Sequence, residues 1–236
     1  MQETPLTPTI PWLVHMLQTV DPFFPIGSYA HSYGLEELVR IGHVSDAEGL
    51  TSYIENIVLH NLSQFELPYL RFLYEAVEQN DWNTIIELDE EIGAAKLSKE
   101  IRNASISQGQ QRLRLIRKLR PCDNFETLQK LKTEKKVQPH HLTLYAIENQ
   151  DIATPLEAVL QAWAYQALAA PCSASLKLIR IGQEGAQTVL TESLQKLANT
   201  VETSLSIERE FAGCFNPLLD IASDRHELAF SRLFIS

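Results

Sequence analysis

The sequence lacks the features of a membrane-spanning, secreted or disulfide-stabilised protein. It has no run of about 18 uncharged apolar residues, and residues 1–10 show neither the basic start nor the apolar stretch of a signal peptide. Its three cysteines, Cys122, Cys172 and Cys214, form no CxxC pair, so they indicate neither a disulfide framework nor a structural zinc site. We therefore expect a cytoplasmic protein whose thiols are buried or idle.

The short motifs of the common enzyme classes are also missing. The sequence contains no HExxH, P-loop, GxGxxG or GxSxG pattern. His15, His43 and His60 stand alone, without a second ligand at a defensible spacing, and we interpret His140 and His141 as a solvent-exposed pair at a helix start. These absences disfavour catalysis and a resident metal, although residues distant in sequence can still meet in an active site.

The composition is that of a folded globular protein with an acidic surface. Of its 236 residues, 44% are hydrophobic and 21% are charged, which excludes disorder as the global state. The net charge of -10 argues against nucleic acid or an anionic membrane as the main partner. Residues 112–136 hold nine basic and three acidic residues and so carry +6, which leaves -16 for the remainder. This stretch could dock an acidic protein, but a solvated helix face and loop is the favoured interpretation.

Hydrophobic residues recur at spacings of three and four throughout the chain, which predicts an all-α fold. Short predicted loops indicate a single irregular bundle of about ten helices within one domain, residues 1–236. The strongest start signals are Pro11, the capping box Ser45–Glu48, Asp81, and the box at 154–157.

Other boundaries are predicted from glycine, proline and polar stretches. We expect Gly109 to interrupt a helix over 98–119, and Pro171 to end the helix that begins near 156. A separate helix is then expected around 176–179, and one further helix over 189–201. Residues 130–140 contain few apolar residues and are the best candidate for a mobile loop.

Two segments near opposite ends of the chain depart from the helical pattern. Residues 21–36 combine two prolines and two glycines with several aromatic side chains, which is typical of a packed plug or a binding surface. The last nine residues contain five large or medium apolar groups and a single charge, that of Arg232. Because free tails are usually polar, this ending must pack either on its own domain or on another subunit.

These segments carry a resemblance to a known family. The sequences PIGSYAHSYGLE at 25–36 and RHELAFSRLFIS at 225–236, with the stretch 182–187 between them, resemble the urease accessory protein UreF family in order and position. The resemblance spans the chain from about residue 12 to residue 236.

The resemblance implies a chaperone that is not an enzyme. UreF-like proteins are all-α homodimers that bind UreD, called UreH in some species, and recruit the GTPase UreG, which delivers nickel to apo-urease. Nickel is then handled by the complex, and this chain holds no cofactor. The resemblance also implies that a tail of about 226–236 becomes ordered on UreD/UreH, and that Tyr29 and Arg232 organise the surface that receives UreG. A modulation of UreG GTP hydrolysis is compatible with this role.

The candidate partner-interface residues all lie in the two unusual segments: Pro25, Gly27, Tyr29, His31, Ser32, Tyr33, Gly34, Glu36, Arg225, His226, Glu227, Ser231, Arg232 and Phe234. No catalytic or metal-binding residue is assigned. Two alternatives stay open: a helical enzyme with a histidine–carboxylate site near His31 or His226, and a stand-alone nickel-binding protein. The exposed apolar segments could also serve self-association alone.

Overall fold

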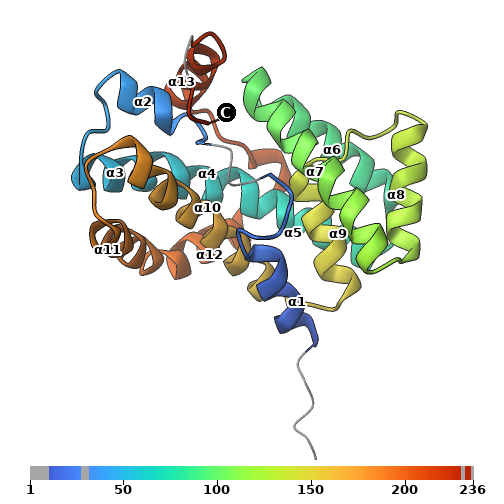
Figure 1. Cartoon of the computed structure of the whole chain (residues 1–236). Coiled ribbons are helices and arrows are strands. Elements are labelled where there is room, and N and C mark those ends of the chain that lie inside the picture. Colours follow the sequence, from blue (N-terminus) through green and yellow to red (C-terminus); the bar gives the residue numbers. More distant parts are fainter. Residues whose placement is uncertain (1–10, 28–31, 230–231, 235–236) are drawn as a thin grey trace, which may run out of the picture.

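The expected all-α fold is confirmed by a computed structural model that describes residues 11–27, 32–229 and 232–234 (Figure 1). These residues form eleven helices, and they include no strand. One helix is long and irregular, because α3, α4 and α5 are continuous through two π-helical turns, η2 and η3. Residues 47–78 therefore form a single rod.

The elements in chain order are α1 (Pro11–Val20), α2 (Leu35–Arg40), α3 (Ala47–Tyr53), η2 (Ile54–Val58), α4 (Leu59–Asn61), η3 (Leu62–Glu66), α5 (Leu67–Glu78), α6 (Trp82–Ala95), α7 (Lys99–Leu119), α8 (Asp123–Thr133), α9 (His141–Asp151), α10 (Leu156–Leu178), α11 (Gln183–Leu194), α12 (Leu197–Ser206), the 3-10 turn η4 (Arg209–Phe211) and α13 (Pro217–Glu227).

Most predicted helix starts are correct to within one residue. Pro11 is the first residue of α1, and the Asp81 carboxylate accepts the N–H of Thr84 at 3.1 Å at the start of α6. The cap of α3 is Asp46 rather than Ser45, since the Asp46 carboxylate accepts the N–H of Gly49 at 2.9 Å. Short polar side chains at these positions satisfy backbone donors that the first helical turn leaves open.

Gly109 does not interrupt the helix, contrary to the sequence prediction. Helix α7 runs through it, and a Cβ at this position would lie 2.0 Å from the carbonyl oxygen of Pro139. The glycine thus marks a crossing of two backbones instead of a helix end. The loop predicted over 130–140 is shorter than expected, because α8 continues to Thr133, and at the end of the loop the Asp89 carboxylate accepts the N–H of His140 at 3.0 Å.

The predicted boundaries around Pro171 are wrong as well. Helix α10 continues through this proline to Leu178, so no separate helix exists around 176–179. Packing of α10 against α5, α11 and α12 compensates for the backbone hydrogen bond that proline cannot make. In the opposite sense, the single helix expected over 189–201 is divided into α11 and α12.

A buried ion pair ties α7 to α9 within the hydrophobic core. Arg112 donates from Nε to a carboxylate oxygen of Glu148 at 2.5 Å, and neither side chain is more than 1% exposed. Arg120 donates to the other carboxylate oxygen of Glu148. On the surface, Arg117 pairs with Glu126. The basic stretch 112–136 is therefore partly neutralised by ion pairs.

The expectation that His140 and His141 are exposed is wrong, because both are buried. His140 Nδ1 lies 3.1 Å from the hydroxyl of Ser105, and His141 Nε2 lies 3.1 Å from a guanidinium nitrogen of Arg112. Burial lowers the pKa of His140 to about 3. The crossing at Gly109 draws this helix start into the core, which the local sequence does not indicate.

Helices α13 and α1 lie far apart on the molecule (Figure 1). Helix α13 packs against α2 and α7, close to the C-terminus, whereas α1 packs against α10. Among the described residues, no helix has both the length and the apolar content needed to cross a membrane.

Candidate interface at the C-terminal helix

Gly34 sets the contact between α2 and α13. It precedes α2 with φ of 80°, a left-handed conformation that favours glycine. A Cβ at this position would lie 2.9 Å from Cδ1 of Leu219 and 3.3 Å from the hydroxyl of Ser223, both on α13. The two helices thus approach so closely that their spacing depends on the absence of a side chain at Gly34.

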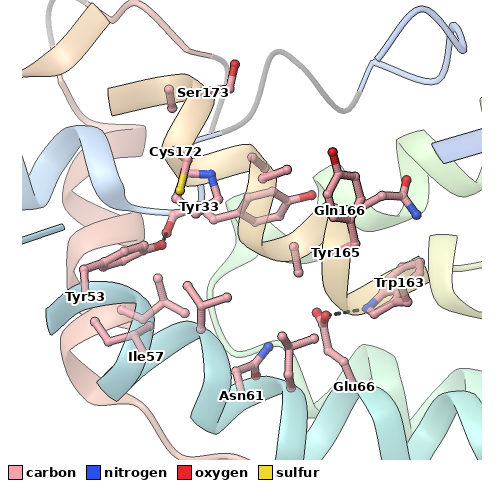
Figure 2. Close-up of a pocket in the computed structure, with 18 of the residues that line it drawn as sticks. Tyr33, Tyr53, Ile57, Asn61, Glu66, Trp163, Tyr165, Gln166, Cys172 and Ser173 are labelled. Atoms are coloured by element: carbon pink, nitrogen blue, oxygen red, sulfur yellow. Dashed lines mark hydrogen bonds between the residues drawn. The ribbon is translucent and has the colours of Figure 1, made fainter. Parts of the chain in front are cut away.

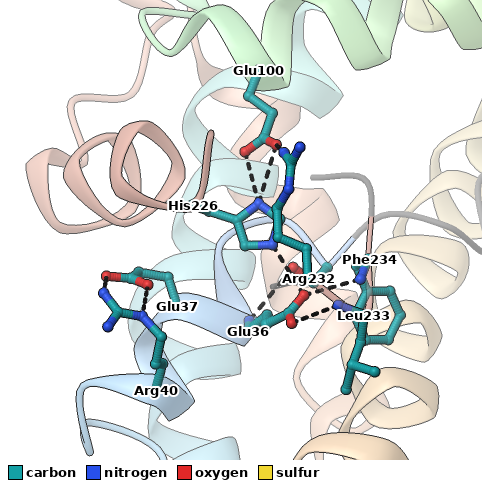
Figure 3. A network of polar contacts seen from close by, with 9 residues as sticks. Glu36, Glu37, Arg40, Glu100, His226, Arg232, Leu233 and Phe234 are labelled. Carbon is teal, nitrogen blue, oxygen red and sulfur yellow. Dashed lines mark hydrogen bonds and ion pairs between the residues drawn. The ribbon is translucent and has the colours of Figure 1, made fainter. Parts of the chain in front are cut away.

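His226, near the end of α13, lies between two carboxylates from distant parts of the chain (Figure 3). Its Nε2 is 3.0 Å from Glu36 of α2, and its Nδ1 is 3.1 Å from both carboxylate oxygens of Glu100 of α7. The histidine is 1% exposed. The buried imidazole ring is thus held between carboxylates from two separate helices. We call these three residues the carboxylate clamp.

The C-terminal segment 232–234 continues from the carboxylate clamp (Figure 3). The backbone N–H groups of Leu233 and Phe234 donate to the two oxygens of Glu36 at 2.8 and 3.0 Å. Arg232 donates to Glu100 at 3.2 Å. The Phe234 side chain is buried, and the ammonium of Lys177 on α10 lies 5.6 Å from its ring centroid.

More exposed ion pairs surround the clamp. Arg40 and Arg225 both pair with Glu37, the neighbour of the clamp residue on α2. Hydrogen bonds from Arg40, with the attraction of its charge, hold the pKa of Glu37 below its usual value. Lys99 of α7 pairs with Glu227 of α13 at 3.0 Å. Both α2 and α7 are therefore joined to α13 by charged groups.

The structure brings together one group of the predicted interface residues: Gly34, Glu36, Arg225, His226, Glu227, Arg232 and Phe234. Tyr29, His31 and Ser231 lie outside the described residues.

The other predicted residues of the first segment have different surroundings. Ser32 is buried and its hydroxyl accepts the N–H of Glu36 at 3.5 Å. Tyr33 accepts the hydroxyl of Tyr53 on its backbone oxygen, and burial raises its own pKa to about 12. Pro25 and Gly27 are exposed, and Gly27 faces the side chain of Gln111 instead of α13.

The outer face of α13 combines exposed apolar side chains with the charged side chain of Arg225. Along it, Leu218 is 40% exposed and Ile221 is 57% exposed, and Leu228 follows at 86% just past the helix end. Residues 218, 221, 225 and 228 have the three-and-four spacing of one helix face. Phe215 before the helix and Leu233 in the tail are 76% and 70% exposed. We call Phe215, Leu218, Ile221, Leu228 and Leu233 the apolar stripe.

A cavity of about 490 Å³ lies beneath the tail (Figure 2). Its walls come from the loop before α2, from the rod of residues 47–78 and from α10, and Phe234 of the tail also lines it. The η3 turn carries Glu66 into this cavity, where the carboxylate accepts Nε1–H of Trp163 at 2.8 Å. Lys96 lies 3.7 Å from the same carboxylate. Glu66 and Lys96, two of the charged groups in the wall, are thus paired with each other.

The described residues include no group of three histidine, cysteine or carboxylate side chains placed to hold a metal ion. The arrangement around α13 consists of a close helix contact, a histidine held between two carboxylates, and exposed apolar side chains on the outer face. Such a combination is typical of a protein–protein interface, with a fixed backbone and large apolar side chains facing outward.

The comparisons with known proteins decide the family. The family model described as UreF matches residues 44–194, which is more than half of the chain. This chain belongs to the UreF family.

Individual UreF proteins match over nearly the full length. The chain is 28% identical to the urease accessory protein UreF of Actinobacillus pleuropneumoniae serotype 5b (strain L20), over 94% of this chain and 97% of that protein. The UreF protein of Haemophilus influenzae (strain PittEE) matches at 28% over 94% of each chain. That of Bacillus sp. (strain TB-90) matches at 28% over 95% of this chain and 99% of its own. The carboxylate clamp and the apolar stripe are thus features of a urease accessory protein.

Sequence reasoning missed two parts of this site. Glu100 lies 126 residues before its partner His226, and nothing in the local sequence distinguishes it from a solvated glutamate. The exposed face of α13 was detectable from the spacing of Leu218, Ile221 and Leu228, but helical spacing alone does not tell a buried face from an uncovered one.

Proposed function

We propose that this UreF-family protein bridges UreD/UreH and the GTPase UreG, and thereby assists the insertion of nickel into apo-urease in the cytoplasm. It acts without catalysis of its own, with nickel as the cargo of the complex and no cofactor on this chain. The observation that carries the proposal is α13, which charged groups join to α2 and α7 while Leu218 and Ile221 on its outer face stay exposed.

We assign the apolar stripe to UreD/UreH. Inner residues of α13, Ala222, Ser223 and His226, are each at most 2% exposed, so the helix is already seated on its own body. Its outer leucine and isoleucine side chains remain in water, where burial by a partner is favourable by about 25 cal/mol per Å² of apolar area. The membership of the chain in a urease accessory family makes another urease maturation protein the fitting occupant.

We assign a second apolar surface, on α1, to homodimer formation. Val14 and Leu17 are 56% and 58% exposed, and Phe23 after the helix is 91% exposed. Helix α1 contains no acidic or basic residue in its first or last turn. A neutral surface suits self-association in a chain of net charge -10, because two copies that meet there avoid repulsion between like charges.

The enzyme alternative receives less support from the geometry. Both ring nitrogens of His226 face carboxylates and the ring is buried, so no nitrogen remains to take a proton from a substrate. The same burial removes His226 from a stand-alone nickel site, since a metal ion would need one of these nitrogens. His31, the other histidine considered, lies outside the described residues.

The first test removes the tail and the last residues of α13. A chain that ends at Arg225 should lose binding to co-expressed UreD/UreH while its helical circular dichroism signal is retained, because Phe234 is the one described residue of the deleted segment that belongs to the hydrophobic core. Unchanged binding by the folded truncation would contradict the proposal.

The second test separates the two apolar surfaces with matched variants. Leu218→Ser with Ile221→Ser should weaken UreD/UreH binding and leave the mass of the free chain unchanged in light scattering. Val14→Ser with Leu17→Ser should leave UreD/UreH binding unchanged and lower the mass of the free chain, because the homodimer no longer forms. Both variants replace exposed residues, so folding should be preserved in each. If the α13 variant binds UreD/UreH as the wild type does, the assignment of the stripe is wrong.

A further inference from the structure

Helix α7 has an unusual composition for an acidic protein. The chain contains 30 acidic residues, yet none of them lies within residues 101–122, a span that contains six basic residues. Between residues 101 and 118, the exposed positions of α7 recur at the three-and-four spacing of one helix face: Asn103, Ser107, Gln110, Arg114 and Lys118. This outer face therefore carries positive charge and no negative charge.

Ion pairs divide the nine basic residues of the stretch 112–136 into two sets. Four of them are paired with carboxylates: Arg112, Arg117, Arg120 and Lys136. The other five lie within ion-pair distance of no carboxylate in the part of the chain that the structure describes: Arg114, Lys118, Lys130, Lys132 and Lys135. Outside this stretch, eight of the eleven basic residues are paired. Unpaired positive charge is thus concentrated on α7 and α8.

The packing of α7 beside α8 gathers three of these bases on one surface. Arg117 donates to Glu126 at 2.8 and 2.6 Å, which joins the exposed sides of the two helices near the loop between them. Arg114 lies one turn before Arg117 on α7, and Lys130 lies one turn after Glu126 on α8, so both are one turn further from that loop. Lys118 follows Arg114 by one turn on the same face. We call Arg114, Lys118 and Lys130 the basic patch.

The basic patch lies apart from the two surfaces assigned above. Helix α8 forms an edge of the molecule, away from both α13 and α1 (Figure 1). Helix α13 contacts α7 at Glu100, at the opposite end of α7 from the basic patch. Next to the patch, Leu119 ends α7 with its side chain 50% exposed. The patch therefore combines positive charge with an apolar side chain on a surface that no other assignment uses.

We propose that the basic patch and Leu119 form a docking surface for an acidic segment of another protein. Carboxylates of that segment take the place of the acidic partners that these bases lack, and an apolar side chain covers Leu119. Residues 112–136 carry +6 and the remainder of the chain carries -16, so a negatively charged segment is attracted here and repelled elsewhere. This inference goes beyond the bridging role and does not depend on it.

The charge distribution favours a short protein segment over a nucleic acid or an anionic membrane. Both of those ligands present negative charge over an extended surface, and they would also face the acidic remainder of the chain. A short segment contacts the patch alone. Because the attraction is between solvent-exposed charges, binding should weaken steadily as the ionic strength rises from about 0.05 to about 0.3 M.

The test measures binding of a fluorescent peptide of glutamates interspersed with leucines to the full chain by anisotropy. The patch variant is Arg114→Glu with Lys130→Glu, and the matched control is Arg180→Glu with Lys196→Glu. Both variants make the net charge more negative by the same amount at exposed positions, so folding should be preserved in each. The patch variant should bind the peptide at least about ten-fold more weakly than the control.

Two further measurements complete the test. If circular dichroism shows that the patch variant is unfolded, Arg114→Gln with Lys130→Gln replaces it, and this milder variant should weaken binding in the same direction. Duplex DNA and vesicles that contain phosphatidylserine are titrated under the same conditions as the peptide. No peptide binding by the wild type, equal weakening in the patch and control variants, or tighter binding of DNA or vesicles than of the peptide would each overturn the proposal.

Discussion

Glu148→Gln should be among the most destabilising single substitutions in this protein. The variant preserves the size of the side chain and removes its charge, which leaves Arg112 as a buried cation without a counterion. Arg112 and Glu148 are 0% and 1% exposed, and Arg120 also donates to Glu148. Breaking a buried pair by removing one partner costs about 3–5 kcal/mol. This is a large share of the roughly 5–15 kcal/mol by which most domains are stable.

A surface pair in the same structure is the control. Glu126 accepts two hydrogen bonds from Arg117 at 2.8 and 2.6 Å, but these two side chains are 56% and 33% exposed. Exposed pairs contribute only about 0.2–1 kcal/mol, so Glu126→Gln should change the free energy of unfolding by less than about 1 kcal/mol. The contrast between the two variants isolates the effect of burial.

Urea denaturation followed by the helical circular dichroism signal measures both variants. The slope of the free energy of unfolding against urea concentration should be the same in the wild type and both variants. The shift in the midpoint of the transition then reports the change in the free energy of unfolding. If Glu148→Gln does not fold, the triple variant Arg112→Met, Arg120→Met and Glu148→Leu should restore folding, since apolar replacement of all three partners removes the buried charges. If Glu148→Gln lowers the free energy of unfolding only as much as Glu126→Gln does, the reasoning is refuted.

Three further predictions concern the helix contact, the buried histidine and the thiols. Gly34→Ala should destabilise the protein by about 1–3 kcal/mol more than Gly42→Ala in urea denaturation: both glycines have φ of 80°, but only at Gly34 would a Cβ meet another helix. The pKa of His140 is lowered from 6.5 to about 3 in the folded chain, so its contribution to stability is present above pH 6.5 and is lost as the pH falls. When the pH falls from about 7 to about 5, the free energy of unfolding of the wild type should therefore decrease by about 2 kcal/mol more than that of His140→Asn. Equal decreases would contradict the lowered pKa of His140. Burial raises the pKa of both Cys122 and Cys172 to about 11, so these thiols should react slowly with alkylating reagents near neutral pH until the protein is unfolded.

The sequence was sufficient to predict the fold class and most helix starts. These features depend on residues close together in the sequence. The Asp81 carboxylate caps α6 by accepting the N–H of Thr84, three residues further on, and Pro11 suits the first turn of α1. The wrongly predicted boundaries lie at residues whose role depends on contacts with distant parts of the chain. Gly109 is a glycine because another backbone crosses α7, and Pro171 stays helical because α10 is packed on several sides.

The candidate site was predictable only in part, for a similar reason. The motifs at 25–36 and 225–236 supplied Glu36 and His226, but their meeting depends on the approach of α2 to α13 at Gly34. Glu100 comes from a third region, and no spacing rule connects it to either motif. A site assembled from three distant segments requires the folded topology before its members can be identified.

The most direct test of the central claim is whether UreG joins UreD/UreH only in the presence of this chain. The three proteins would be mixed in all pairs and together, and the mass of each complex measured by light scattering after size-exclusion chromatography. A bridge predicts a UreG-containing complex in the full mixture and none from UreG with UreD/UreH alone. Association of UreG with UreD/UreH without this chain, or its failure to join when the chain is bound, would contradict the account.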